Sequence, residues 1–484
     1  LADLGPELVT TGRLLDRAIV LADPLALDGR PDAPRVSAAR WREVLGSLRQ
    51  ASLDPPGWTT DAAIRARTAD LAARGLVPLA VLDLACERLR ADALATGVLV
   101  REGSRLVGAP GATTDDLLER RRVTAAAALD PVLHHGDRAR FVLPREHLIT
   151  DTPVTVAVHL GDGRGWRTLR PDVPVEASYA STGVHEVRVR LTAADGQIRW
   201  SRFTVSVVAL DTPDPTFTWP LTASIPHDGA AASGEVFVYL ADGHAEVTAP
   251  VVVVEGFDLN DDLNWPELYA LLNQQNLLED LRAAGRDAVV LNFDVATDPI
   301  QRNAYLLVEL LQTLDDDLPP GATYPVIGAS MGGLVARYAL AWLEQEGGGH
   351  ACDLFVSFDA PQAGAVIPLG LQCWLDFFAA ESSEAAALLS RLDTVGARQM
   401  LLHHHTALDG TTARPSPLYA DLRADLAALG DWPAQPRLVA VANGSGTGQD
   451  QGFAAGEQLV WYEYESFLVD IVGNVWAVPD GSSQ

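Results

Sequence analysis

The chain has 484 residues, of which 48% are hydrophobic and 21% charged, and this composition is that of a folded protein with two or three domains. Acidic residues number 64 against 36 basic ones, so the formal net charge of −28 disfavours nucleic acid and anionic membrane surfaces as partners. Every Lys/Arg position is arginine. Without lysine the chain cannot form a Walker-type phosphate loop, a Schiff base or a Ser-Lys dyad. No apolar run is long enough to predict a membrane-spanning helix.

Residues 1–135 are predicted to be a helical N-terminal region. Apolar residues recur at helical spacing from Pro34 to Leu53 and again from Val77 to Leu94. We find no chemistry in this region and interpret it as a packing domain. The chain begins at Leu1 and not at Met, which suggests that a signal peptide or another upstream segment was removed.

Residues 136–212 are predicted to form a small β-sandwich. Apolar residues alternate with polar ones from Val154 to Leu160, and a Gly-Asp-Gly turn follows at 161–163. Together with Tyr179–Val187 (YASTGVHEV), this turn resembles the PKD-type Ig-like module over about 138–210. Such modules are usually extracellular, so the resemblance implies a secreted or extracytoplasmic protein.

Residues 213–484 are predicted to form a doubly wound α/β domain. Continuous apolar runs alternate there with helical stretches, which is typical of strands that are buried on both faces of a parallel sheet. The runs are Val251–Val254, Ala288–Phe293, Tyr324–Ile327, Leu354–Phe358 and Leu438–Ala442.

The sharpest chemical signal is Gly328-Ala329-Ser330-Met331-Gly332, the only G-x-S-x-G pattern in the sequence. A predicted strand enters the pattern and a predicted amphipathic helix leaves it. A serine on such a turn has a strained backbone and an exposed hydroxyl at a helix N-terminus, where N–H groups favour a developing oxyanion. Ser330 is therefore the predicted nucleophile.

Residues 328–339 (GASMGGLVARYA) resemble the nucleophile elbow of lipase-type α/β-hydrolases, and the resemblance extends from about residue 250 to the C-terminus. It implies that the backbone N–H of Met331 is one donor to the oxyanion. It places the second donor in the loop at 254–258, where the Phe257 N–H is expected and the Asp258 N–H is the alternative. Glu255 stands where lipases typically carry histidine.

The resemblance also implies an acid that orients a catalytic histidine. Asp359 follows a predicted strand, in a segment (SFDAPQAG) that resembles T-P-H-x-G after the sixth strand of lipases. Asp450 lies after the next strand, which is the more usual place for the acid. We favour Asp359, while a purely structural role for it stays open.

The histidine is missing from its expected place after the last strand. The final histidines, His403–His405, precede the run at 438–442, and none follows. We expect the catalytic histidine beyond Gln484 or on a partner chain, with His405 as the best internal substitute. Adjacent residues of a helix point about 100° apart, so we interpret the three histidines as a helix end and predict no metal site.

Between residues 362 and 436 lies a predicted helical insertion, where lipase-type enzymes place their lid and acyl pocket. Trp374, Phe377 and Phe378 are the candidate substrate-binding residues, and their alternative role is in the core.

The sequence thus predicts a serine hydrolase that cleaves carboxylic esters through an acyl-Ser330 intermediate, without metal or cofactor. Its expected substrate is a small-molecule, lipid or polyester ester. The alternatives are an amidase or acyltransferase with the same nucleophile, and an inactive hydrolase fold that serves as a binding module.

Overall fold

A computed structural model describes residues 8–54, 56–102, 105–258, 263–409, 412–443, 452–454, 456–465 and 470–476. The chain divides into two compact units. Unit 1 comprises residues 1–211, 378–386 and 461–474, and unit 2 comprises residues 212–377, 387–460 and 475–484.

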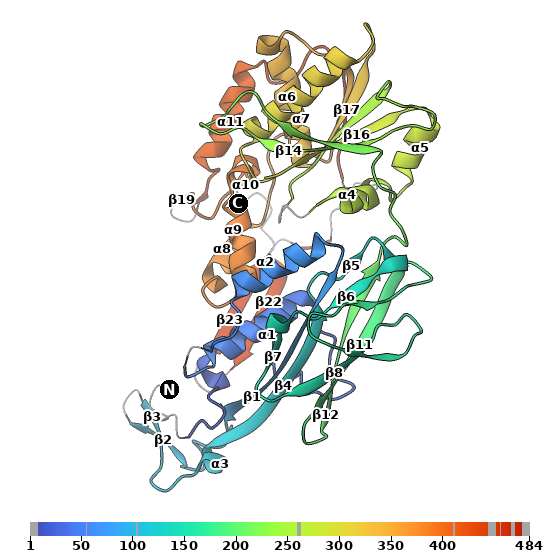
Figure 1. The fold of residues 1–484 in the computed structure, drawn as a ribbon. Helices are drawn as coiled ribbons and strands as arrows, with labels where there is room; N and C mark the ends of the chain where they lie inside the picture. The colour runs from blue at the N-terminus through green and yellow to red at the C-terminus, as the bar shows by residue number, and fades with distance from the viewer. Residues whose placement is uncertain are drawn as a thin grey trace. The chain divides into compact units, whose positions relative to one another are not determined.

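Unit 1 contains two five-stranded sheets (Figure 1). The strand order is β10-β6-β1-β4 in the first sheet, where β7 also pairs with β1, and β5-β12-β11-β8-β9 in the second. The strands are β1 (Val77–Leu89), β4 (Leu118–Ala128), β5 (Val132–Leu133), β6 (Arg140–Val142), β7 (Leu148–Thr150), β8 (Val154–His159), β9 (Trp166–Leu169), β10 (Val175–Glu176), β11 (Gly183–Ala193) and β12 (Ile198–Val207). The helices are α1 (Ala38–Gln50), α2 (Asp61–Ala72) and α3 (Thr114–Leu117), and β2 (Leu99–Glu102) pairs with β3 (Arg105–Gly108).

Strand β1 lies where the apolar pattern predicted a helix. Its side chains alternate between two cores. Leu79 and Val81 pack with the second sheet, whereas Leu82 and Leu84 pack with α1. Because both faces of β1 are buried, no polar face marks the two-residue period, and an apolar run of this kind does not distinguish strand from helix. The predicted helix over 77–94 is wrong.

The predicted boundary at residue 135 passes through a continuous core. Val77 and Ala126 share one hydrophobic cluster with Val156, Val187 and Phe203. The predicted helical region and the predicted sandwich are therefore parts of one compact unit. The antiparallel strands expected from residue 154 onward are present as β8, β11 and β12, while the PKD-type identity stays a prediction.

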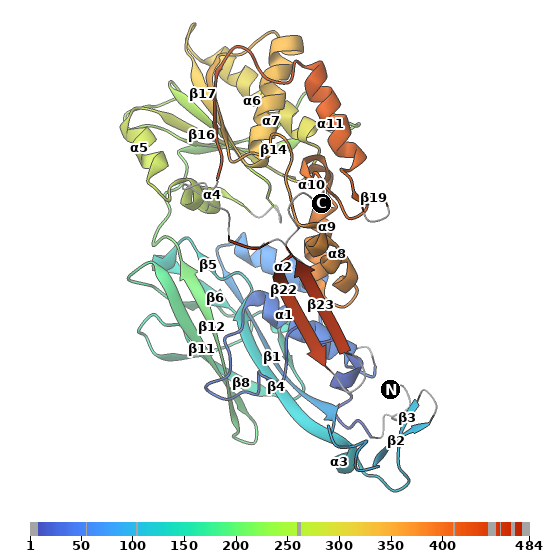
Figure 2. The same ribbon diagram turned by 180° about the vertical axis from the view of Figure 1, so that it is seen from behind.

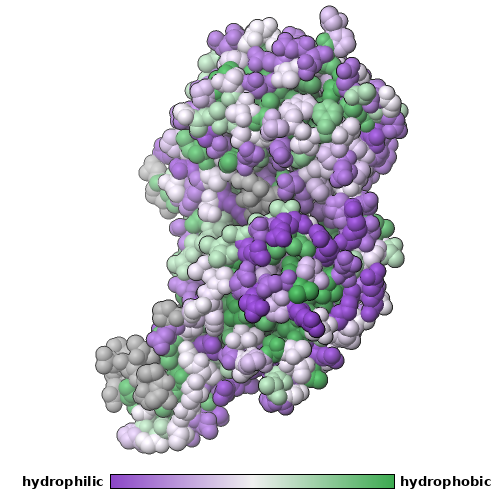
Figure 3. All heavy atoms as spheres, in the orientation of Figure 1, coloured by the Kyte–Doolittle hydropathy of each residue, from purple (hydrophilic) through white to green (hydrophobic). Residues whose placement is uncertain are grey.

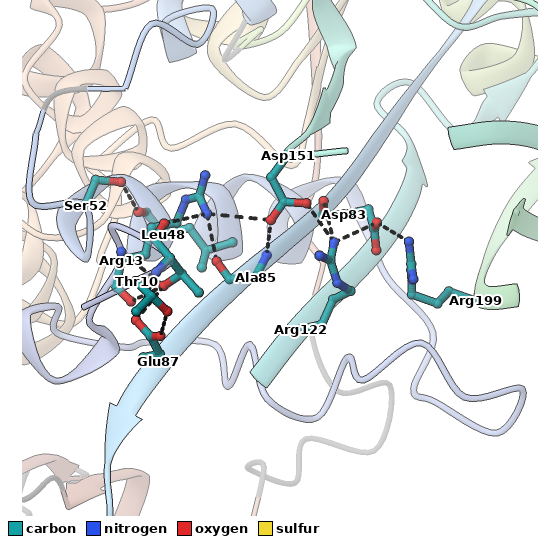
Figure 4. Close-up of polar contacts among 11 residues, drawn as sticks. Thr10, Arg13, Leu48, Ser52, Asp83, Ala85, Glu87, Arg122, Asp151 and Arg199 are labelled. Carbon is teal, nitrogen blue, oxygen red and sulfur yellow. Dashed lines mark hydrogen bonds and ion pairs between the residues drawn. The ribbon is translucent and has the colours of Figure 1, made fainter. Parts of the chain in front are cut away.

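A buried ionic network joins three strands of unit 1 (Figure 4). The Asp83 carboxylate on β1 is fully buried and accepts from Arg122 (3.0 Å), Arg199 (2.8 Å) and Thr124 (2.8 Å). Arg122 also donates to Asp151 at 2.8 Å. Each buried charge here is neutralised by an opposite one, which is what a structural network requires, so we do not interpret it as a site.

Unit 2 is built on a seven-stranded sheet of order β13-β14-β16-β15-β17-β18-β21. Its strands are β13 (Phe217–Thr222), β14 (Ser233–Tyr239), β15 (Pro250–Val254), β16 (Asp287–Phe293), β17 (Tyr324–Ala329), β18 (Cys352–Phe358) and β21 (Arg437–Val441). The first two strands are antiparallel additions, and the other five are mutually parallel. These five coincide with the five predicted apolar runs, which confirms the α/β prediction.

Helices cover both faces of this sheet. Figure 1 shows α6 and α7 along one face, where their apolar residues form one large core with the strands. Trp265, Leu268 and Leu278 of α4 and α5 form a second core on the opposite face. The helices are α4 (Trp265–Leu272), α5 (Leu277–Ala283), α6 (Ile300–Asp317), α7 (Met331–Trp342), α8 (Leu369–Phe378), α9 (Ser383–Leu392), α10 (Val395–Met400) and α11 (Pro417–Ala428), with a π-turn at Leu343–Gly347.

The predicted insertion is helical, since α8 to α11 all lie between β18 and β21, with a small hairpin of β19 (Leu408–Asp409) and β20 (Thr412–Ala413). Near the C-terminus β22 (Gln458–Glu465) and β23 (Asp470–Trp476) form a two-stranded sheet (Figure 2). None of the described helices is long and apolar enough to cross a bilayer. Figure 3 shows hydrophilic residues over much of the visible face, in keeping with the net charge of −28.

Candidate active site

Ser330 occupies the single residue between the end of β17 and the start of α7. Its backbone has φ 51° and ψ −125°, a conformation that is strained for a residue with a side chain. The Ser330 N–H donates to the carbonyl of Phe358 at 2.9 Å, which ties the turn to the neighbouring strand. The side chain is exposed. The hydroxyl is therefore presented at the carboxyl edge of the sheet, at the N-terminus of α7.

Three glycines permit the close packing that this turn requires. A Cβ on Gly328 would overlap the carbonyl of Gly332, and a Cβ on Gly332 would lie 2.6 Å from the carbonyl oxygen of Val254. A Cβ on Gly256 would lie 3.2 Å from Cβ and 3.8 Å from Oγ of Ser330. The loop that follows β15 therefore passes directly beside the serine.

Two backbone N–H groups in this region are open. Among the described residues, neither the N–H of Met331 nor that of Phe257 donates to a protein acceptor. Met331 begins α7, and Phe257 lies in the loop beside Ser330. An open N–H at a helix N-terminus and another on the adjacent loop are the donor types that stabilise an oxyanion.

The two acidic residues of the loop after β15 accept hydrogen bonds from backbone N–H groups. Glu255 is buried and accepts the N–H of Phe293 at 2.8 Å, so it caps the neighbouring strand β16. Asp258 is buried and accepts the N–H of Leu263 at 2.8 Å.

Asp359 directly follows the end of β18, the strand next to the one that precedes Ser330. Ala329 pairs with Phe358 in the parallel register of β17 and β18, so Ser330 and Asp359 follow adjacent strands at the same level. The exposed Asp359 has φ 48°, and its Oδ1 accepts the N–H of Asn443 at 2.8 Å. The alternative acid, Asp450, lies outside the described residues.

His405 lies in a non-helical segment, which differs from the predicted helix end. Backbone hydrogen bonds from Gly396 to Thr297 (3.0 Å) and from Ala365 to Met400 (2.7 Å) hold residues 395–402 against the loops that follow β16 and β18. The segment thus lies at the same edge of the sheet as Ser330.

The His405 ring is nonetheless engaged elsewhere. Its Nε2 lies 3.0 Å from Asp393 Oδ1. Within the described part of the chain, no histidine ring makes a hydrogen bond to Ser330 or Asp359. His244 and His350 pair with Asp287 and Glu344 at the opposite edge, where the parallel strands begin. The structure thus places Ser330 and Asp359 at the ends of adjacent strands, and among the described residues no histidine bonds to either of them. The role of His405 as base stays a prediction.

The three predicted substrate-binding residues on α8 have different environments. Phe377 is 69% exposed and Trp374 is half-buried. Phe378 is only 2% exposed, belongs to unit 1 and packs edge-on against Tyr462 at 5.6 Å between ring centroids. An apolar depression in unit 2 is lined by Phe355, Ser357, Trp432, Leu438, Val439 and Ala440, and so does not include these residues. The acyl site stays a prediction.

Sequence reasoning missed a buried polar clamp, which Arg337, Gln362 and Asp431 form beside the strand–helix turn of Ser330. Arg337 on α7 is 1% exposed, and its guanidinium donates to the Gln362 side chain (3.2 Å) and to Asp431 (3.0 Å) and stacks over Trp432. Burial lowers the pKa of Arg337 to about 10. Gln362 in turn donates to the carbonyl of Gly333 at 2.9 Å, so the clamp holds the first turn of α7 against the Asp359 loop. The only sequence signal was an arginine on an otherwise apolar helix.

No protein-family model and no curated protein sequence matches the chain. Solved structures with local similarity include Candida antarctica lipase A in its closed state, with 8% identity, 40% of each chain covered and a TM-score of 0.22. They also include esterase Est22, with 14% identity, 31% of this chain and 45% of that one covered and a TM-score of 0.25. A third is a Pyrobaculum calidifontis esterase, with 14% identity, 47% of this chain and 76% of that one covered and a TM-score of 0.26. The chain thus spans less than half of the length of the first two.

Proposed function

We propose that unit 2 is a serine hydrolase of the α/β-hydrolase type that cleaves carboxylic esters through an acyl-Ser330 intermediate. One observation carries the proposal. Ser330 is an exposed serine in a strained backbone conformation at a strand–helix elbow, beside two open N–H groups. A strained backbone at a sheet edge persists only where the surroundings impose it, and such strain is concentrated at functional sites.

The chemistry follows from these groups. Ser330 Oγ attacks the ester carbonyl carbon while a base takes its proton, and the carbonyl oxygen becomes an oxyanion that accepts from the N–H groups of Met331 and Phe257. Collapse of this intermediate breaks the bond to the alkoxy oxygen, which receives the proton and leaves as alcohol. Water then repeats the attack on the acyl-enzyme, which releases the acid and restores Ser330.

The proton acceptor in this scheme is an imidazole that Asp359 orients. His405 is the internal candidate because its segment lies at the correct edge of the sheet. Its bond to Asp393 argues for the other expectation, an imidazole that is not among the 11 histidines of this sequence. Loss of turnover in His405→Ala with retained fold would favour His405, and unchanged turnover would favour the second source.

A fluorophosphonate probe tests the nucleophile. We expect it to label Ser330, and we expect Ser330→Ala to lose both labelling and hydrolysis of short p-nitrophenyl esters. Ser390→Ala is the matched control, because Ser390 is an exposed serine of unit 2 whose hydroxyl donates only to a helix carbonyl. Labelling at another residue, or full turnover by Ser330→Ala, would remove the proposal.

Other results of these assays would indicate one of the two alternative functions, an amidase or acyltransferase and an inactive binding module. Faster turnover of anilides, or acyl transfer to an added alcohol in preference to water, would indicate an amidase or an acyltransferase. The inactive binding module is favoured by one observation, that within the described residues no histidine ring reaches Ser330 or Asp359. Absence of both labelling and turnover would support it.

A further inference from the structure

Three side chains of the helical insertion converge at one point, and they include His405, the internal candidate for the catalytic base. Asp393 follows α9, and His404 and His405 follow α10. Asp393 Oδ1 lies 3.3 Å from His404 Nε2 and 3.0 Å from His405 Nε2, and all three potential ligand atoms lie within 4.8 Å of one another. Because residues 402–406 are not helical, the two adjacent rings lie together, with centroids 4.7 Å apart.

The two distances from Asp393 are those of a coordination sphere. Ligand atoms about 2.0–2.1 Å from a tetrahedral zinc ion lie about 3.3 Å from one another. The backbone carbonyl oxygen of Leu392 also lies 3.1 Å from His404 Nε2. Two imidazoles and one carboxylate form a set suited to zinc and similar divalent transition metals.

Further contacts orient the two rings. His404 Nδ1 lies 2.8 Å from Thr406 Oγ1 and accepts the Thr406 N–H at 3.3 Å, which holds the ring with Nε2 toward the cluster. The buried Gln372 accepts the His405 N–H at 3.1 Å and donates to the His403 carbonyl at 3.1 Å, which holds the backbone of the segment in place. His404 is fully buried, so its ring is held by the surrounding protein.

We propose that Asp393, His404 and His405 bind a divalent transition metal ion, with zinc as the best fit. The ion would join the end of α9 to the segment after α10 and so act on the structure of the insertion. This proposal goes beyond ester hydrolysis and excludes His405 as its base, because a His405 Nε2 bound to the ion cannot also take the proton of Ser330. It also contradicts our prediction from sequence that the histidines form no metal site.

Zinc binding by the purified full chain, stripped with chelator and dialysed, tests the site. We expect one zinc ion per chain by calorimetry, visible d–d absorption typical of tetrahedral geometry when cobalt(II) is used instead, and a rise in the thermal midpoint on zinc addition. Asp393→Asn and His405→Ala should each weaken zinc binding at least about tenfold and abolish the thermal shift.

His403→Ala is the matched control, because His403 belongs to the same segment but not to the cluster, and it should bind zinc as the wild type does. Asp393→Asn keeps the test decisive if His405→Ala does not fold, since Asp393 is 39% exposed and the change is nearly isosteric. Equal binding by all four proteins, or no saturable binding by the wild type, would overturn the proposal. Fluorophosphonate labelling of the same samples reports separately on Ser330.

Discussion

Gly332 shows how one missing side chain positions the elbow. It lies where α7 passes the end of β15, and a Cβ there would meet the carbonyl oxygen of Val254 at 2.6 Å. Backbone cannot move aside as a flexible side chain can, so any larger residue must push the helix away from the sheet. The position of Ser330 and of the Met331 N–H depends on that close approach.

We therefore expect Gly332→Ala to lower the free energy of unfolding by about 1–3 kcal/mol and to reduce fluorophosphonate labelling of Ser330. Gly46→Ala in α1 is the control, because a Cβ there meets nothing within 4 Å. It should raise the free energy of unfolding by about 0.5–1 kcal/mol, since glycine is a poor helix former. Denaturant titration measures both. Full stability and labelling in Gly332→Ala would contradict the packing argument.

At the scale of the element, α8 presents its aromatic residues to different surroundings. Phe378 is buried against Tyr462, whereas Phe377 is largely exposed and Trp374 is half-buried. Helical spacing placed Trp374 and Phe378 on one face, and the structure shows that the two rings on this face differ in burial.

Alanine substitutions along α8 separate core from substrate contact. Phe378→Ala should lower the free energy of unfolding by about 3–5 kcal/mol, because it removes a fully buried ring. Phe377→Ala should leave stability nearly unchanged, since that ring is 69% exposed. If Trp374 lines an acyl site, Trp374→Ala should shift kcat/KM toward longer acyl esters at little cost in stability. A large loss of stability with unchanged chain-length preference would indicate that Trp374 is a core residue and does not contact substrate.

At the scale of the whole molecule, buried histidines couple stability to pH. Burial lowers the pKa of His134 from 6.5 to about 4, and it also lowers the pKa of His147 and His350. At pH values between 6.5 and the lowered pKa of each histidine, the unfolded chain binds more protons than the folded one. The free energy of unfolding therefore decreases as the pH falls.

The free energy of unfolding should therefore be greatest above pH 6.5 and should decline progressively between pH 6.5 and about 4. Denaturant titrations at pH 7.5 and pH 5 measure the decline. His134→Gln should make it smaller, because glutamine does not take up a proton in this range. A profile that is flat from neutral to acidic pH, or one that this substitution leaves unchanged, would contradict the assignment.

The sequence alone was sufficient for features that depend on neighbours along the chain. The elbow is local, because a strand, two glycines around Ser330 and an amphipathic helix are consecutive, and its strained geometry was predictable from them. The five parallel strands were predictable for the same reason, since each is a short apolar run between helical stretches.

Tertiary structure decided what depends on segments that are distant in the chain. β1 was misread because its two apolar faces are covered by different elements, which no local period reveals. Asp393 meets His404 and His405 only because the chain turns back after α10, and an expected helix would have kept the two rings apart. Local patterns specify which groups a segment carries, whereas the packing of distant segments determines which of those groups meet.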